Sequence, residues 1–360
     1  MKRNILIIRP SAIGDIVMAS PMIRAIKSSW PDAKITWLVD PAAKDLLVHH
    51  PLLDDIIFWS KSRWRLLFRS RRLGELRREV MQLIRELRGR QFDLVLDAQG
   101  LLRSRIIAWS SGAKRRYGFV SKEPGGFLMT RIISRGPDSC KMSSEYLHMV
   151  NHLGIHPESF HPEIHLPDKV LEGAVVVKNR ASISSDYAIF CPFTTRPQKH
   201  WYEDRWAVLA EILQRRFAIS TVLLGGNGDI EAAGRITYMS SEKIWNMAGK
   251  TTIGEAAALI KDARIVIGVD TGLTHLGSAF DRPTVALFGA TCPYVETQSP
   301  FTVVLHEPRP CSPCRRRPTC DNEFYCMQGH SAGDIADRVE LLLNLSERGN
   351  ASSSEVVEAV

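Results

Sequence analysis

The stretch NILIIRPSAIGD, residues 4–15, decides the fold class of this chain. Its apolar run predicts a buried strand over Asn4–Arg9, and the pattern that follows predicts a helix over Asp15–Ser29. Gly14, between the two, allows the backbone to approach a ligand closely. A strand that passes through a short turn into a helix is typical of a parallel sheet covered by helices on both faces.

The alternation of strand and helix continues along the chain. We expect further strands at 34–40, 54–59, 92–97, 187–193, 221–225, 264–270 and 284–288, and helices at 72–87, 206–215, 253–261 and 273–280. The predicted fold class is therefore α/β. It consists of two Rossmann-like, doubly wound domains that face each other across a cleft. In such sheets ligands bind outside the carboxyl ends of the strands, which favours a shared site in that cleft.

Prolines mark the expected boundary between the two domains. Pro157, Pro162 and Pro167 interrupt any regular element in this region. A chain of 360 residues is long enough for two domains, each with its own core. We predict domains at 1–165 and 166–345, and a loose polar tail at 346–360.

Composition indicates a globular protein of the cytoplasm. The chain is 44% hydrophobic and 24% charged, as soluble domains are. No stretch approaches the ~18 consecutive apolar residues of a membrane span. The apolar run near the N-terminus ends at Arg9, short of the ~7–15 residues of an export signal.

The net charge of +8 is concentrated in one window. Residues 61–90 contain eleven basic and three acidic side chains. Such a field attracts an anionic partner, which can be a nucleic acid, a membrane surface or a phosphorylated substrate. The alternative is a solvated helix face that keeps the protein in solution.

Two nucleotide-binding motifs are incomplete. Residues 249–251, GKT, resemble the end of a P-loop, but position 244 is Ile where that motif requires Gly. Residues 226–231, GNGDIE, begin like a dinucleotide fingerprint, but Glu231 occupies the place of the third Gly. A dehydrogenase or a phosphoryl-transfer enzyme is therefore not favoured.

Three segments place reactive side chains directly after predicted strands. They are RPSAIGD at 9–15, FTTRPQKHW at 193–201 and VDTGLTHL at 269–276. Asp15 can act as a general base at the mouth of a cleft, or it can only favour the start of its helix.

The hydroxyls and lysine of the second segment suit phosphate oxygens, unless the segment is an ordinary polar turn. The third segment begins a helix whose free amides can bind an anion. Alternatively, Thr271 is only a cap and His275 only a buried core residue.

Five motifs in order give the chain a family resemblance. They are Ser11–Asp15, Asp97–Leu101, Lys122–Pro124, Thr194–Thr195 with Lys199–Trp201, and Asp270–Leu276. Together they resemble glycosyltransferase family 9, the heptosyltransferases of lipopolysaccharide core synthesis, from Ile5 to about Arg338. The second and third motifs look most like the enzymes that add the first heptose, and those that add the second are the alternative.

The resemblance implies a GT-B fold and an inverting transfer from ADP-heptose that uses no metal and no cofactor. The catalytic residues of the family match Asp15, as the base, and Lys199. Its donor-binding residues match Thr194, Thr195, Lys199, Thr251, Asp270, Thr271, Gly272 and His275.

The implied acceptor is an acidic glycolipid. Candidate acceptor residues are Ser11, Gly14, Arg63, Arg65, Gln99, Arg103 and Lys122. Basic and apolar residues alternate over Arg63–Phe68, which suits a loop lying against an anionic membrane. We therefore expect peripheral contact with the inner membrane. A family-9 enzyme with another donor or acceptor is the alternative. A nucleic-acid-binding protein is a remote one, because no recognised module accompanies the basic window.

Four cysteines near the C-terminus form a separate cluster: Cys311, Cys314, Cys320 and Cys326. Four thiolates suit a structural zinc ion, although the chain has one CxxC pair where the usual ribbon has two. Reduced thiols or a labile disulfide are the alternatives. A closed four-thiolate site has no open position for catalysis.

Overall fold

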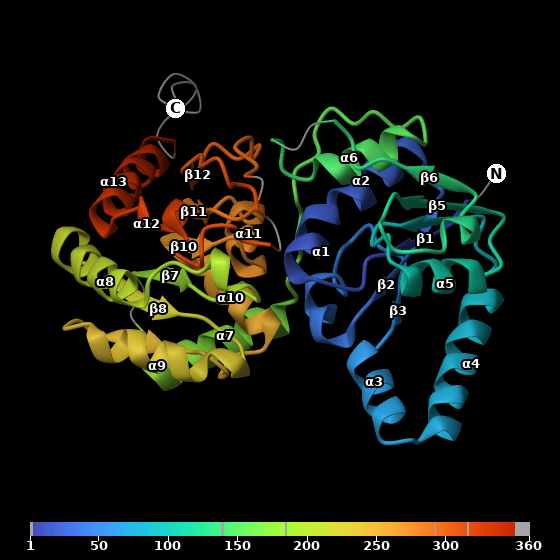
Figure 1. Ribbon diagram of the computed structural model, residues 1–360, viewed down its shortest axis with the longest axis horizontal. Helices are drawn as coiled ribbons and strands as arrows, with labels where there is room; N and C mark the ends of the chain where they lie inside the picture. Colours follow the sequence, from blue (N-terminus) through green and yellow to red (C-terminus); the bar gives the residue numbers. More distant parts are fainter. Residues whose placement is uncertain (1–2, 138–139, 184–185, 292, 315–316, 350–360) are drawn as a thin grey trace. The chain divides into compact units, whose positions relative to one another are not determined.

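The computed structural model describes residues 3–137, 140–183, 186–291, 293–314 and 317–349. The chain divides into two compact units. Unit 1 comprises residues 1–138 and 143–165, and unit 2 comprises residues 139–142 and 166–360. Each unit has one six-stranded sheet with helices around it (Figure 1).

The sheet of unit 1 is parallel throughout and has the order β3-β2-β1-β4-β5-β6. Its strands are β1 Asn4–Ile8, β2 Lys34–Val39, β3 Asp55–Phe58, β4 Leu94–Asp97, β5 Arg115–Phe119 and β6 Arg131–Ile133. In the centre, Ile5 pairs with Ile35 on one side and with Leu94 on the other. The short strands β5 and β6 were not expected from the sequence.

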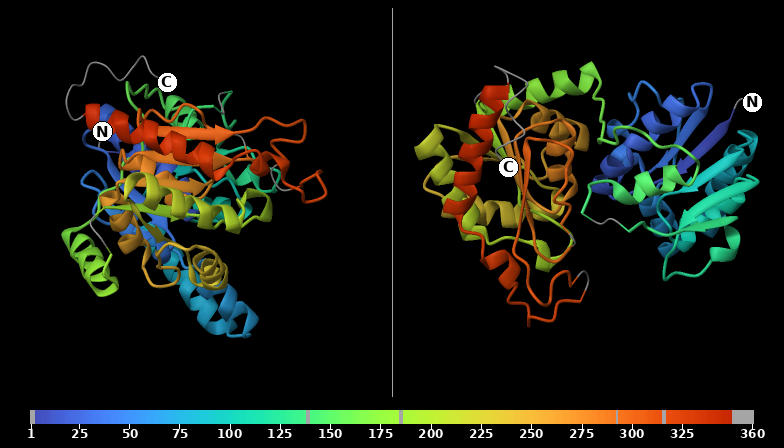
Figure 2. Two further views of the ribbon diagram at one scale, coloured as in Figure 1. Left: turned by 90° about the vertical axis from the view of Figure 1, so that its left-hand side faces the viewer. Right: turned by 90° about the horizontal axis from the view of Figure 1, so that it is seen from above.

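Helices cover both faces of this sheet (Figure 2). They are α1 Ile13–Ala19, α2 Pro21–Ser29, α3 Lys61–Arg69, α4 Leu73–Gly89, α5 Leu102–Ser110 and α6 Ser144–Asn151, with short 3-10 turns at Pro41–Leu46 and Gly126–Leu128. Ile5 and Ile7 face the core formed with α2 and α6, whereas Leu6 and Ile8 face the core formed with α4 and α5. The central strand is thus buried on both sides, as its continuous apolar run predicts.

Two expectations for unit 1 need correction. The helix expected over 15–29 is two helices, because Pro21 begins a new helix at a position where its missing N–H costs little. The segment expected as a loop over Arg63–Phe68 lies in α3. Ser60 caps the start of this helix, because its hydroxyl accepts a hydrogen bond from the Arg63 N–H at 3.4 Å. Together α3 and α4 form a hairpin that extends away from the sheet (Figure 1).

Unit 2 repeats the strand order of unit 1, as β12-β11-β10-β7-β8-β9, again all parallel. Its strands are β7 Tyr187–Cys191, β8 Ser220–Leu223, β9 Ile244–Asn246, β10 Ile265–Val269, β11 Thr284–Phe288 and β12 Thr302–His306. Numbered within each unit, both sheets read 3-2-1-4-5-6, the order of the Rossmann fold.

The helices of unit 2 are α7 Asp168–Ala181, α8 Glu203–Phe217, α9 Ile230–Met239, α10 Ile253–Asp262, α11 Gly272–Ala279, α12 Tyr325–Gln328 and α13 Ala332–Gly349, with 3-10 turns at Pro197–Lys199 and Asn227–Asp229. Because α13 runs to Gly349, the first residues of the expected tail are helical, and residues 350–360 lie outside the described part. Within the described ranges, no helix combines the length and apolarity needed to cross a bilayer.

Candidate active site

Each sheet reverses its strand order at one point, and the candidate residues gather there. In unit 1 the reversal lies between β1 and β4, and in unit 2 between β7 and β10. The loop after β1 leads to Asp15, and the loops after β7 and β10 carry Lys199 and Asp270. Ligands of doubly wound proteins bind in the crevice that such a reversal opens at the carboxyl ends of the strands.

Asp15 lies in the first turn of α1 and contacts a buried arginine. Its Oδ2 accepts from the Ala12 N–H at 3.1 Å and pairs with the Arg9 guanidinium. The Asp15 side chain is 40% exposed, whereas that of Arg9 is 5% exposed and donates to the Ala98 carbonyl at 2.7 Å. Asp15 therefore does cap its helix, and its carboxylate is also held at the solvent boundary by a fixed cation.

Asp97, at the end of β4, organises the neighbouring loop. It is fully buried and accepts hydrogen bonds from the Gln99 and Gly100 amides at 3.1 and 3.0 Å and from Ser104 Oγ at 3.0 Å. Burial raises the pKa of Asp97 to about 6 against these hydrogen bonds. Its role is to place Gln99 and the start of α5 beside the loop after β1.

A pocket of about 390 Å³ lies at this reversal point, lined among others by Lys61, Arg65, Gln99 and Arg103. Lys61 donates to Ser11 Oγ. Burial, and the nearby charges of Arg9, Arg103 and Arg65, lower the pKa of Lys61, which Asp40 offsets in part. Cations held this close together are suited to an anionic ligand.

Three of the predicted acceptor residues thus line the pocket, and Ser11 adjoins it through Lys61. Gly14 is buried in the first turn of α1. Arg63 is not at the pocket, because its guanidinium pairs with Glu79 of α4 at 2.6 Å. Lys122 is exposed in the loop after β5, and it is the next residue, Glu123, that lines the pocket.

Lys61 is the pocket residue that sequence reasoning missed. It was counted within the basic window, but nothing in its spacing distinguished it from ten other cations. The structure selects it by position: it begins α3 directly after the end of β3, whereas the remaining arginines of α3 lie further along the helix.

In unit 2, Lys199, Asp270 and His275 form a compact group. Lys199 Nζ pairs with Asp270 Oδ2 and donates to the Asp270 carbonyl at 3.2 Å. His275 Nε2 lies 3.3 Å from Asp270 Oδ1. Burial raises the pKa of Asp270, but His275 and Lys199 outweigh it and hold this pKa well below its ordinary value.

Two residues that the sequence did not single out complete this group. Tyr294 is buried and hydrogen-bonds through its hydroxyl to His275 Nδ1. Burial and the charge of Asp270 raise the pKa of Tyr294 well above its ordinary value, so its hydroxyl keeps its proton. Thr291 Oγ1 also donates to Asp270 Oδ2, at 2.6 Å.

The other predicted donor residues lie in the adjoining loops of unit 2. Thr271 precedes α11 in an extended conformation, with no capping hydrogen bond from its side chain, and Gly272 begins the helix. Thr194 and Thr195 follow β7, where His200 Nε2 donates to the Thr194 carbonyl at 2.8 Å. Thr251 is half-buried before α10, in the loop that follows β9.

This geometry agrees with what the chain resembles. The model of glycosyltransferase family 9 (heptosyltransferase) matches residues 80–324, more than half of the chain. The chain belongs to glycosyltransferase family 9. It is therefore a glycosyltransferase.

Individual relatives extend the match over most of this chain. Lipopolysaccharide heptosyltransferase 1 of Pseudomonas aeruginosa is 29% identical over 330 residues, covering 88% of this chain and 87% of that protein. ADP-heptose LPS heptosyltransferase II of Escherichia coli aligns with a TM-score of 0.75 at 22% identity, covering 96% of this chain and 100% of that one. E. coli heptosyltransferase WaaC with ADP-2-deoxy-2-fluoro heptose gives a TM-score of 0.69 at 22% identity, covering 94% and 99%. The two solved structures confirm the expected fold class, GT-B with two Rossmann-like units.

The four cysteines near the C-terminus of this chain do not form a metal-ligand cluster. Cys311, Cys314, Cys320 and Cys326 are all free thiols. Burial and then their mutual charges raise the pKa values of Cys314 and Cys326, so they lie in one neighbourhood. Yet no three of these four described residues bring their sulfurs within 4.8 Å of one another. The tetrahedral zinc site stays a prediction that this arrangement does not support.

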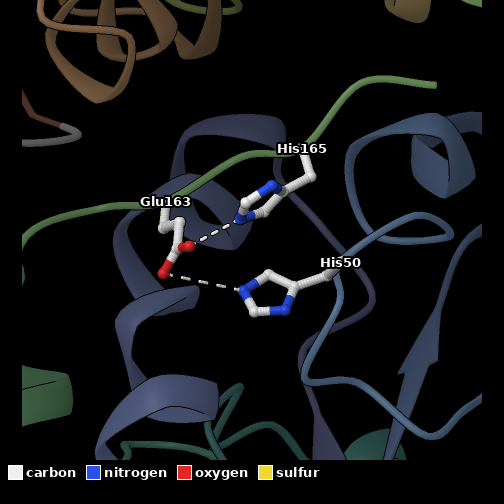
Figure 3. Close-up of side chains that lie close together, drawn as sticks. All are labelled: His50, Glu163 and His165. Atoms are coloured by element: carbon white, nitrogen blue, oxygen red, sulfur yellow. Dashed lines mark hydrogen bonds and ion pairs between the residues drawn. The ribbon is translucent and has the colours of Figure 1, made fainter. Parts of the chain in front are cut away.

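Among the described residues, one group does offer metal-ligand atoms within 4.8 Å of one another: His50, Glu163 and His165 (Figure 3). Arg24 already occupies both Glu163 oxygens, with its Nε 2.6 Å from Oε2. The Leu52 N–H donates to His50 Nδ1 at 3.2 Å, which places the lone pair of the neutral ring there. His50 Nε2 therefore carries the proton and lies 4.0 Å from Glu163 Oε2, beyond hydrogen-bond distance. The group is organised by the ion pair of Arg24 and Glu163, which ties residues 163–165 to α2 within unit 1.

This cluster predicts a loss of stability in mild acid. Burial lowers the pKa of His50 from 6.5 to about 4. The unfolded chain therefore takes up this proton at a higher pH than the folded chain, and the free energy of unfolding falls as pH drops from about 6.5 to 4. The separation of the two pKa values corresponds to roughly 3 kcal/mol at most. His50→Asn keeps an acceptor for the Leu52 N–H but does not titrate, so its unfolding free energy should fall less over this window.

Urea unfolding of the full chain at several pH values measures this difference in the free energy of unfolding. The matched control is His49→Asn, which changes the exposed neighbouring histidine and should follow the wild type. Equal pH dependence in all three proteins would show that His50 is not held neutral.

Proposed function

We propose that this protein transfers heptose from ADP-heptose, with inversion, to the inner-core acidic sugar of a lipopolysaccharide precursor, and that Asp15 is the general base. The observation that carries the proposal is the gathering of Asp15 at one strand reversal and of Lys199, Asp270 and His275 at the other. Transfer to the heptose-bearing acceptor of a heptosyltransferase II, or another family-9 reaction, is the alternative.

In the proposed reaction, Asp15 takes the proton of the acceptor hydroxyl as its oxygen attacks the anomeric carbon. Both contacts given above for Asp15 use Oδ2, so Oδ1 is the oxygen that receives the proton. The bond from the anomeric carbon to the diphosphate breaks on the opposite face, through a transition state that resembles an oxocarbenium ion. ADP leaves with the electron pair of that bond.

The leaving group needs positive charge, which unit 2 supplies. Lys199 is mostly buried and fixed by Asp270. The free amides at the start of α11, at Gly272, add the positive end of a helix. Fixed charges of this kind stabilise developing charge without reorganising during the reaction, which is often the largest catalytic contribution. No metal and no cofactor enters the proposed mechanism.

On the acceptor side, Lys61, Arg65 and Arg103 hold the acidic sugars or phosphates of the glycolipid. Their common pocket favours a discrete anion over the extended backbone of a nucleic acid. The exposed cations of α3 and α4 give the protein a peripheral contact with the anionic inner face of the cytoplasmic membrane.

The pocket yields a prediction for Arg65→Glu. Reversing this charge should raise the KM for the acidic acceptor at least about tenfold, since a charge-assisted contact becomes a repulsion. The effect should shrink with added salt, which screens exposed charges over ~8–10 Å at moderate ionic strength. Initial rates at varied acceptor concentration, at low and high salt, measure it.

Arg69→Glu is the matched control, because Arg69 is an exposed arginine of the same helix outside the pocket. It should change the acceptor KM little. Equal effects of the two variants would assign the contribution to the general charge of α3. Loss of polynucleotide binding without any change in acceptor kinetics would favour the nucleic-acid alternative.

Donor and acceptor specificity test the function itself. We expect ADP-heptose to be consumed in preference to other ADP-, UDP- and GDP-sugars, and only with an acceptor that carries the inner-core acidic sugar. Acceptors with and without a first heptose distinguish the two heptosyltransferase activities. Transfer from another sugar nucleotide, with none from ADP-heptose, would refute the proposed donor.

A further inference from the structure

A second hollow adjoins the acceptor pocket of unit 1. It lies between α3 and α4 and has a volume of about 360 Å³, which is within the ~300–1,000 Å³ of small-molecule sites. Trp64 and Phe68 of α3 line it on one side, and Leu76 and Val80 of α4 line it on the other. Its lining is thus aromatic and aliphatic, although it is open to solvent on a strongly basic hairpin.

The two hollows adjoin each other. Both are lined by Trp59, Lys61, Arg65 and Arg103. The residues that both hollows share are mostly cationic. On one side of them the acceptor pocket leads toward Ser11 and Gln99, and on the other side lies the apolar hollow. A ligand that matches this order of surfaces has polar groups at one end, anionic groups in the middle and a hydrocarbon chain at the other end.

The surface around the hollow is apolar beyond what the fold requires. Leu67 of α3 and Leu83 and Leu87 of α4 already supply the core contacts of the hairpin. Phe68 remains 66% exposed beside Arg69 and contributes nothing to that core. Exposed apolar surface rimmed by charge is typical of a binding site.

We propose that the hollow between α3 and α4 binds an acyl chain of the glycolipid acceptor, while the shared cations hold the anionic groups next to that chain. The identity of the acceptor rests on the proposed function. Binding of an alkyl chain beside an anionic group does not, and it can be measured without any transfer reaction.

The binding test uses the full chain and an alkyl phosphate with bromine atoms in the middle of its chain, kept below its micelle concentration. The bromines should quench the fluorescence of Trp59 and Trp64, which line the hollow. Val80→Phe fills the hollow and should weaken the affinity measured by quenching about tenfold or more, since even one methylene in an apolar pocket changes binding by ~10–200-fold. Met81→Phe, on the same helix but outside the hollow, should leave it unchanged.

Phe68→Ser gives a second variant with little risk to folding, because Phe68 is largely exposed. It should also weaken quenching. Saturable quenching that neither Val80→Phe nor Phe68→Ser changes would overturn the proposal, as would the absence of quenching. A third outcome is that Phe68→Ser weakens binding to anionic vesicles and leaves binding of the monomeric alkyl phosphate unchanged. That result would make this face a membrane surface and would also overturn the proposal.

Kinetics then connect the hollow to the acceptor. Two acceptors with the same sugars are compared, one with a single short acyl chain and one fully deacylated. Val80→Phe should raise the KM of the acylated acceptor about tenfold and leave that of the deacylated acceptor unchanged. An equal rise for both would place the effect in the sugar pocket and overturn the acyl site. If the wild type uses neither acceptor, the proposed function fails, and the quenching result alone decides whether the hollow binds an alkyl chain.

Discussion

Replacing Asp15 by Asn is expected to lower kcat for sugar transfer by about 10²–10⁴-fold, the usual loss when a general base is removed. The variant is chosen for what it preserves. An Asn side chain at this position still accepts from the Ala12 N–H and the Arg9 guanidinium through its carbonyl oxygen. It has no carboxylate to take up the proton of the acceptor hydroxyl. Progress curves with saturating donor and acceptor measure the loss.

Two controls separate a base from a helix cap. The melting temperature should fall, because an Asn in the first turn loses the charge–dipole contribution, about 0.3–1 kcal/mol, and also the charge opposite the buried Arg9 guanidinium. The kcat is therefore measured well below the melting temperature of the variant. ADP affinity should not change, since the proposed donor residues belong to unit 2. Activity within a few-fold of the wild type would leave Asp15 with its capping role alone, and another base would be needed.

Most of the fold follows from local sequence patterns. The eight predicted strands correspond to β1–β4, β7, β8, β10 and β11. Seven of them are largely buried apolar runs in the interior of a parallel sheet, and such runs are the clearest strand signals, whereas β3 is an edge strand. Of the four missed strands, β6, β9 and β12 are edge strands and β5 is next to one. β5 includes the charged pair Arg115–Arg116, and β6 and β9 have three residues each. The positions of these strands therefore depend on pairing with a neighbouring strand.

The candidate site could be predicted in part, because its residues follow strands. Asp270 comes directly after β10, and Asp15 and Lys199 lie in the segments that follow β1 and β7. Parallel strands deliver such residues to one edge of a sheet. Tyr294 and Thr291 could not be predicted. They lie after β11, and they reach His275 and Asp270 through tertiary contacts that leave no periodic pattern in the sequence.

The basic window shows the limit of reasoning from charge. Arg63 and Arg65 are two residues apart, and residues at this spacing do not share a helix face. In α3, Arg65 lines the pocket and Arg63 pairs with Glu79. The sequence alone treated both as acceptor contacts, because it expected a loop, in which neither side chain has a fixed direction.

Replacing Lys199 by Ala is expected to lower kcat by about 10²–10³-fold, as the loss of one fixed group that stabilises developing charge does. ADP affinity should also fall, because in the proposed mechanism the same ammonium faces the diphosphate before and after the reaction. Calorimetric titration with ADP and steady-state rates measure the two effects. Lys243→Ala is the matched control, since this exposed lysine precedes β9 at the opposite ends of the strands. It should change neither quantity.

A second variant shows whether Lys199 acts on the substrate or only on Asp270. Removing the lysine leaves the mostly buried Asp270 carboxylate without its cation, and an unpaired buried charge destabilises a protein by about 3–5 kcal/mol. The double variant Lys199→Ala/Asp270→Ala removes that unpaired charge. If Lys199 stabilises the leaving diphosphate, the double variant regains stability and stays inactive with weak ADP binding. Recovery of activity and of ADP binding together with stability would reduce Lys199 to a partner of Asp270 and would place the diphosphate site on the amides of α11 alone.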